Sequence, residues 1–282
     1  MQRVRGFTLV EIAVVLVIVS LIAAVMFAGL RTATTSAKYR TTNQVLQNAD
    51  AALVNFVTLA KRLPCPANGG LPPGDVNFGR EMTPCTATTD QTNGVVPWVT
   101  LGLPQADVTD GFGNLITYRV SAGLVVADSM NFTACDSVGG SLTPAATPST
   151  CACPDPLVGT TVPGQCTNYN SALGGKGIAV NGIAMSDPAA NPPTGAAYVL
   201  ISQGANQGPA FSPQGALSPG VGTIGSNEGP NAANVALQAA YFDVAIDGSD
   251  TPSHFDDILL HPSVSNVASR AGVSARTHLP AP

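Results

Sequence analysis

Six cysteines could form disulfide bonds or bind a metal, depending on their spacing: Cys65, Cys85, Cys135, Cys151, Cys153 and Cys166. An even number of cysteines, all placed after a hydrophobic N-terminus, favours disulfide bonds in an exported chain. Closing the loop between Cys65 and Cys85 would stabilise the fold by about 3 kcal/mol through chain entropy. A metal site at Cys151-x-Cys153 is the alternative, but no second close pair or nearby histidine supports it. We therefore predict disulfides, within the chain or to a neighbouring chain, with partners left open.

A second group of candidate ligands is a set of aspartates near the C-terminus: Asp243, Asp247, Asp250, Asp256 and Asp257. Carboxylate oxygens at short spacing are ligands for Ca²⁺. Their spacing matches no calcium loop that we can defend, so we interpret them first as turn and surface residues and keep calcium as the alternative. The three histidines are isolated in the sequence and are interpreted as surface or packing residues: His254, His261 and His278.

Known catalytic motifs are missing from the sequence. It contains no G-x-S-x-G, no H-E-x-x-H and no glycine loop with the spacing that cradles phosphate. We predict no enzymatic activity and no confident metal or cofactor.

Glu11 is the only charged residue in an apolar segment that runs from Phe7 to Leu30. About 24 residues at about 1.5 Å each span roughly 36 Å, enough to cross a bilayer core. Two arginines precede the segment, which predicts a cytoplasmic N-terminus with the rest of the chain outside the inner membrane. A carboxylate in such a segment costs about 2.5–3.5 kcal/mol, so it is usually retained because it has a partner. This argues against a plain anchor and against a secretory signal cleaved near Ala28.

The string Gly6-Phe7-Thr8-Leu9-Val10-Glu11 resembles the processing site of type IV prepilins. The resemblance implies that prepilin peptidase cleaves between Gly6 and Phe7 and methylates the new amine of Phe7. It also implies that Glu11 pairs with the terminal ammonium of a neighbouring subunit, where each charge offsets the burial of the other. Many family members have a proline in the apolar helix near the position of Ala28. This chain has none before Pro64, so local melting of the helix is not implied.

The sequence becomes amphipathic after Arg31. Apolar residues recur at spacings of three and four, which predicts one face of a helix: Leu46, Ala49, Leu53, Phe56, Val57 and Ala60. Leu63-Pro64 ends the pattern because the residue before a proline avoids the α region. A helix over residues 7–62 would be about 84 Å long. Its first half has no soluble partner in the chain, and its second half suits packing on a sheet, as in the ladle shape of pilins.

Runs rich in Val, Ile and aromatic residues predict short strands at residues 95–99, 115–120, 123–126, 197–201, 241–246 and 257–260. Asn181-Gly182, between residues 178–180 and 183–185, predicts a hairpin. Long polar stretches at residues 129–176 and 203–233 predict loops. The predicted fold class is α+β: a pilin-like ladle, with a long N-terminal helix packed on an antiparallel β-sheet head with long loops.

The predicted organisation has four parts. They are a leader (1–6), a long helix (7–62, with 7–30 transmembrane or in the filament core and 31–62 amphipathic), a β head with disulfide-bearing loops (63–262), and a flexible tail (263–282).

Four internal strings are similar to one branch of pilin-like proteins: residues 62–67, 97–103, 110–114 and 255–258. The string Asp110-Gly111-Phe112-Gly113-Asn114 resembles the turn that precedes a strand in pilins and pseudopilins. Major pseudopilins of type II secretion use a C-terminal calcium loop, which is the family parallel for the aspartates.

Only 10% of residues are charged and the net charge is −5, so no basic face for nucleic acid is predicted. The resemblance implies a structural subunit of a type IV pilus or type II secretion pseudopilus. Its implied partners are prepilin peptidase, other pilin subunits, an inner-membrane assembly platform and the lipid bilayer. The subunit would span the inner membrane once, with its head in the periplasm, before it joins the filament. Length and long loops favour a minor subunit. The alternative is a membrane-anchored binding protein or adhesin.

Overall fold

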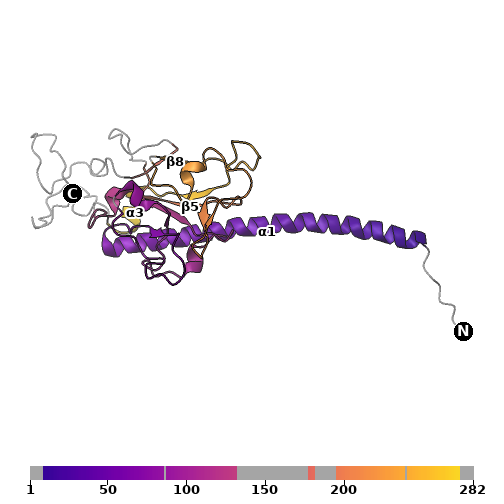
Figure 1. Cartoon of the computed structure of the whole chain (residues 1–282), viewed down its shortest axis with the longest axis horizontal. Coiled ribbons are helices and arrows are strands. Elements are labelled where there is room, and N and C mark those ends of the chain that lie inside the picture. Colours follow the sequence, from indigo (N-terminus) through magenta and orange to yellow (C-terminus); the bar gives the residue numbers. More distant parts are fainter. Residues whose placement is uncertain (1–8, 86, 132–176, 182–194, 239, 274–282) are drawn as a thin grey trace, which may run out of the picture.

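The computed structural model describes residues 9–85, 87–131, 177–181, 195–238 and 240–273, with the backbone alone for residues 23–33, 88 and 240. The chain begins with one long helix, α1 (Leu9–Ala60). The N-terminal part of α1 projects from a head that packs against its C-terminal part (Figure 1). Long runs without proline or helix-breaking residues let the helix continue, and it ends where Lys61 adopts a φ of 55°.

The head is built on a five-stranded antiparallel sheet with the order β1-β2-β3-β5-β9. The strands are β1 (Ala67–Asn68), β2 (Gly94–Val95), β3 (Thr117–Val120), β5 (Tyr198–Ser202) and β9 (Ile258–Leu260). The central pair sets the register, with Tyr118 opposite Leu200. Every residue of β3 and β5 is buried, so the sheet is covered on both faces at its centre.

Smaller elements complete the head. β4 (Ala179–Val180) pairs in parallel with β8 (Ala240–Tyr241), and β6 (Ala210–Phe211) pairs with β7 (Leu217–Ser218). The 3₁₀ helices are η1 (Thr88–Gln91), η2 (Gln105–Val108), η3 (Ala122–Leu124) and η4 (Gly229–Asn231), and a short α-helix, α3, spans Val264–Arg270.

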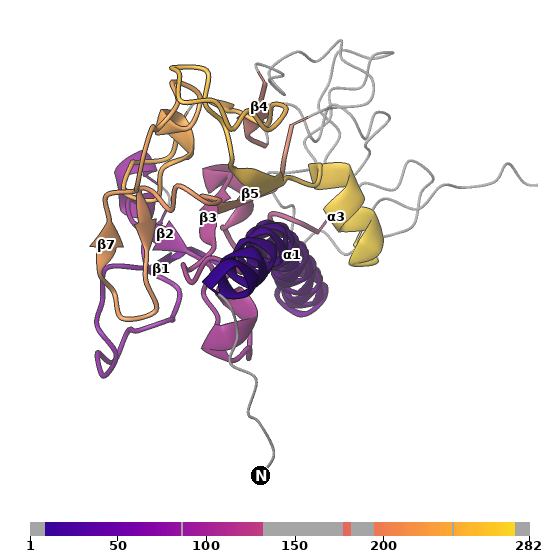
Figure 2. The same ribbon diagram turned by 90° about the vertical axis from the view of Figure 1, so that its right-hand side faces the viewer.

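The main core lies between α1 and the sheet. Leu46, Ala49, Leu53 and Val57 of α1 are almost fully buried, as their spacing predicts. Figure 2 looks along α1 and shows β3 and β5 on one side of it and α3 beside it. The predicted α+β class, with a long N-terminal helix on an antiparallel sheet, is confirmed.

Two local predictions are wrong. Residues 123–126 are not a strand: the chain turns into η3 after β3, and Leu124 is buried as its carbonyl accepts a hydrogen bond from the N–H of Leu63. The flexible tail predicted from residue 263 is wrong for residues 263–273. Ser263 caps α3, and Val264 and Val267 are buried in the main core. Packing of these apolar residues in the core stabilises a helix too short to be stable alone.

The strand predicted at residues 95–99 is limited to Gly94–Val95, and two further strand predictions need qualification. The second strand of the predicted hairpin at Asn181-Gly182 lies outside the described residues, and the first strand is β4, which pairs with β8. The strand predicted at residues 241–246 is limited to Ala240–Tyr241.

Candidate functional site

The projecting end of α1 has an apolar surface. The large apolar side chains described between Leu9 and Ile22 are at least half exposed, from 87% for Leu9 to 51% for Ile22. Glu11 lies on this exposed stretch. The head lies away from this end of α1 (Figure 1), so in a single chain these aliphatic side chains stay exposed.

The cleavage residues Gly6 and Phe7 lie outside the described residues. The predicted span of residues 7–30 is described only in part, since side chains of residues 23–33 are not described. Within the part of the chain that the structure describes, none of the helices has the length and the apolar character needed to cross a membrane.

A disulfide and an ion pair stabilise the part of the head that directly follows α1. Cys65 and Cys85 form a disulfide. Arg62 donates two hydrogen bonds of 2.9 Å to the carboxylate of Glu81, which also accepts the N–H of Cys65 at 3.0 Å. Burial acts to raise the pKa of Glu81, but these donors bring it below its ordinary value. The other cysteine candidates, Cys135, Cys151, Cys153 and Cys166, lie outside the described residues.

The turn at residues 110–114 holds the sheet against α1. The Asp110 carboxylate accepts the N–H groups of Phe112 and Asn114 and the hydroxyl of Ser202, the last at 2.6 Å. The N–H of Gly111 donates to Thr42 Oγ1 of α1 at 3.0 Å. Burial raises the pKa of Asp110, and its hydrogen bonds oppose that shift. The turn therefore sets how the head sits on the helix.

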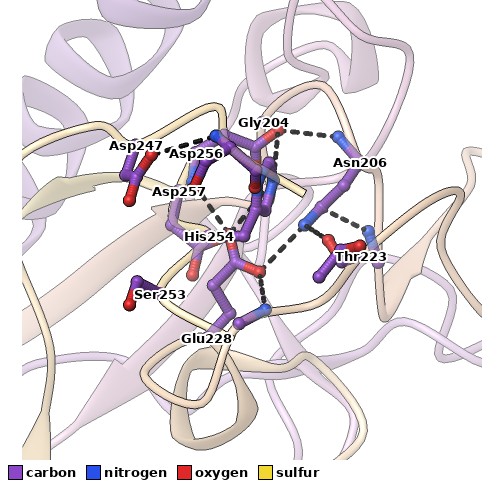
Figure 3. A network of polar contacts seen from close by, with 12 residues as sticks. Gly204, Asn206, Thr223, Glu228, Asp247, Ser253, His254, Asp256 and Asp257 are labelled. Carbon is purple, nitrogen blue, oxygen red and sulfur yellow. Dashed lines mark hydrogen bonds and ion pairs between the residues drawn. The ribbon is translucent and has the colours of Figure 1, made fainter. Parts of the chain in front are cut away.

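A cleft of about 250 Å³ opens on the head beside the segment that leads into β9, and His254 and Asp256 line it together with Asn206, Thr223 and Asp250. Figure 3 shows His254, Asp256 and Glu228 converging there from loops far apart in the sequence. Their potential ligand atoms all lie within 4.8 Å of one another, the one group of three or more such side chains found in the described part of the chain.

The carboxylate of Glu228 accepts hydrogen bonds from three residues. One carboxylate oxygen accepts the N–H of Asp256 at 2.8 Å, and the other accepts the N–H of Gly225 at 2.7 Å and the side-chain amide of Asn206 at 3.0 Å. Asp256 Oδ2 accepts the backbone N–H of Asn206 at 2.8 Å. Burial raises the pKa of Asp256, and the nearby charge of Glu228 adds to that rise.

The five predicted calcium aspartates do not gather at one point. Asp256 lies in the group of three, and Asp250 lines the same cleft and contacts Thr223. Asp243 lies 3.0 Å from His261 Nε2, Asp247 accepts the N–H of Ser249, and Asp257 accepts the side-chain amide of Asn231. Calcium binding by these residues stays a prediction.

Sequence reasoning missed Glu228 and His254. Glu228 lies in a Gly/Pro/Asn-rich stretch read only as a loop, and His254 was interpreted as an isolated residue. No local spacing joins the two, because the fold alone brings their loops together.

The comparison with known proteins concerns the N-terminal segment of the chain. Residues 1–27 match the family described as the prokaryotic N-terminal methylation motif. This is a type IV prepilin-like cleavage and methylation signal, and it supports a precursor of the pilin or pseudopilin kind. Searches of the curated proteins and of the solved structures find no match to the chain.

Proposed function

We propose that this chain is a structural subunit of a type IV pilus or a type II secretion pseudopilus. It is processed by prepilin peptidase between Gly6 and Phe7, N-methylated on Phe7 and assembled through α1. The observation that carries the proposal is the methylation motif, which leads directly into a helix with one exposed apolar end and one end packed in the head.

The exposed apolar end of α1 has to be kept away from water both before and after assembly. Apolar surface removed from water is worth about 25 cal/mol per Å². The aliphatic side chains from Leu9 to Ile22 can be covered by lipid before assembly and by helices of other subunits afterwards. The head stays in the periplasm and offers a polar surface at the filament exterior, and an inner-membrane platform drives the transfer.

Glu11 then sets the register between subunits. A carboxylate among apolar helices is stabilised when an opposite charge lies close to it. The freed, methylated amine of Phe7 in a neighbouring subunit supplies that charge.

We propose a minor rather than a major subunit, because the polar stretches predicted as loops, residues 129–176 and 203–233, exceed what a compact repeating unit needs. The protein is a substrate of the peptidase and carries out no chemical step itself. A second candidate is a membrane-anchored binding protein or tip adhesin, and the cleft beside His254 is the observation that favours it.

The test is the intact mass of the membrane form made in cells with and without prepilin peptidase. We expect loss of residues 1–6 and one added methyl group only when the peptidase is present. Gly6→Leu should retain the leader, because a side chain at this position blocks the cleavage site, whereas the control Gln2→Ala should be processed normally. A mature chain that begins near Gly29 would refute the proposal.

A further inference from the structure

We propose that Glu228, His254 and Asp256 form a site for one divalent cation of the zinc class, a borderline metal that accepts both nitrogen and oxygen ligands. The inference concerns the head alone and goes beyond the assembly role proposed above. The observation behind it is the direction in which Nε2 of His254 points.

The orientation of His254 is fixed by its other nitrogen. Nδ1 lies 2.9 Å from the carbonyl oxygen of Ser249, which can only accept a hydrogen bond, so Nδ1 carries a proton. Nε2 then points towards two carboxylates, at 3.7 Å from Asp256 Oδ2 and 4.0 Å from Glu228 Oε1. Metal-binding histidines have this arrangement, with the second ring N–H donated to a backbone carbonyl.

The spacings fit a shared cation better than they fit hydrogen bonds. Both distances exceed the range of about 2.7–3.2 Å for a hydrogen bond from nitrogen to oxygen. Zinc lies about 2.0–2.2 Å from nitrogen and carboxylate ligands, so two tetrahedral ligands of one ion are about 3.4 Å apart, and more at wider angles. A small inward movement of the three side chains (Figure 3) would complete the coordination.

The cluster also leaves buried polar atoms unsatisfied. Within the described part of the chain, His254 Nε2 and Asp256 Oδ1 are buried without a hydrogen-bond partner. Asp256 is only 4% exposed and Glu228 only 1% exposed, so two carboxylates lie side by side out of solvent. A divalent cation bound between them would satisfy the orphaned Nε2 of His254 and offset the repulsion between the carboxylates.

The donor set selects the class of metal. Calcium and magnesium prefer oxygen ligands alone, whereas an imidazole nitrogen with carboxylates suits zinc. Hydrogen bonds from Asn206 and Gly225 hold the carboxylates in place, as outer partners do at metal sites. The cleft lined by His254 and Asp256 leaves room for water as a fourth ligand. The bound ion would tie the loop that carries Glu228 to the segment that leads into β9.

The test is titration of the untagged full-length chain in detergent with Zn²⁺ by calorimetry, after treatment with a chelator and without reductant. We expect one ion per chain at this site. His254→Gln should weaken its affinity about 100-fold or more, since loss of an outer partner alone costs about 10–100-fold. His261→Gln is the matched control: His261 Nε2 faces a single carboxylate, Asp243, at 3.0 Å, and its loss should leave zinc binding unchanged.

Two further experiments distinguish loss of zinc binding from misfolding of a variant. Zn²⁺ should raise the Tm of the parent and of His261→Gln but not of His254→Gln. Asp256→Asn, which can still accept the N–H of Asn206, should also lose binding. The proposal is overturned if the parent binds no zinc, if His254→Gln binds it as tightly as the parent, or if Ca²⁺ displaces zinc at equal concentration. In the first two cases His254 forms only an ion pair or a structural contact in the cleft, and in the third the site prefers an oxygen-binding cation.

Discussion

Tyr198 of β5 donates a hydrogen bond of 2.6 Å to the carboxylate of Asp50 on α1, and both residues are buried. The second oxygen of Asp50 lies 2.5 Å from Arg270 Nη2 of α3. One carboxylate on α1 thus joins strand β5 of the sheet to α3. Burial raises the pKa of Tyr198 well above its ordinary value, and the Asp50 charge adds to the shift, so the hydroxyl stays protonated and remains a donor.

Asp50→Ala should therefore destabilise the head. The Tyr198 hydroxyl would be left buried without an acceptor, which costs about 1–3 kcal/mol. The ion pair with Arg270 adds little, because the Arg270 side chain is 40% exposed. Urea unfolding of the parent and variant measures the difference. Asn55→Ala, at an exposed position of the same helix, should change stability by no more than a few tenths of a kcal/mol.

Gly111→Ala tests the contact between the turn and α1. A Cβ at this position would lie 2.2 Å from the carbonyl oxygen of Lys38 in the helix backbone, so the turn must move away. We expect a loss of about 1–3 kcal/mol, as is typical of overpacking. Gly123→Ala is the matched control, because nothing lies within 4 Å of its added carbon. Equal stability of the two variants in thermal unfolding would contradict the observed docking of the turn.

Asp257 gives the head a pH dependence. Burial raises its pKa well above the ordinary 3.8, a hydrogen bond from Asn231 opposes the shift, and the charges of Glu228 and Asp256 add to it. The folded state therefore holds this proton at pH values where the unfolded state has released it. Stability that is fully present below about pH 3.8 is lost as pH rises towards the folded pKa, by about 1.4 kcal/mol per pH unit.

Asp257→Asn removes that loss and keeps an oxygen that can accept from Asn231. We expect stability measured by urea unfolding to fall less between about pH 4 and pH 7 in the variant than in the parent. Parallel curves for the two proteins would show that Asp257 does not hold its proton in the folded state.

The disulfide should carry measurable stability. Its sequence separation of 20 residues corresponds to about 3 kcal/mol of chain entropy. The double variant Cys65→Ser, Cys85→Ser should lose about that much in urea unfolding without reductant. Peptide mapping of a non-reduced digest checks the pairing directly, and recovery of Cys65 linked to any other cysteine would contradict it.

Glu11→Gln tests the assembly proposal. The variant should be cleaved and methylated as the parent is, because the cleavage site is unchanged. Its yield in sheared filaments should fall about tenfold or more, since each 1.4 kcal/mol of lost attraction is tenfold. Ser20→Ala is the control, because Ser20 lies on the same exposed stretch and its hydroxyl donates to the carbonyl of Val17 in its own helix. Parent-like filament yield from Glu11→Gln would remove the electrostatic part of the proposal.

Sequence patterns predicted the elements that depend on the spacing of nearby residues. The spacing of Leu46, Leu53 and Val57 predicted the packed face of α1, and the string from Gly6 to Glu11 predicted the methylation motif. Predictions were wrong where tertiary contacts outweigh local preference. The run at residues 123–126 has strand composition, yet the chain turns there to bury Leu124, and Val264 and Val267 find a place in the core that tail-like composition did not indicate.

By itself, the sequence determined the processing signal and the amphipathic helix, because both are written in neighbouring residues. Only the tertiary structure decided which polar groups meet. Asp50 contacts Tyr198 and Arg270, and Glu228 lies beside His254 and Asp256, across sequence separations that no periodic pattern indicates. The physical reason is that buried charges must be paired or hydrogen-bonded, and which partner each one finds depends on how the helix, sheet and loops pack together.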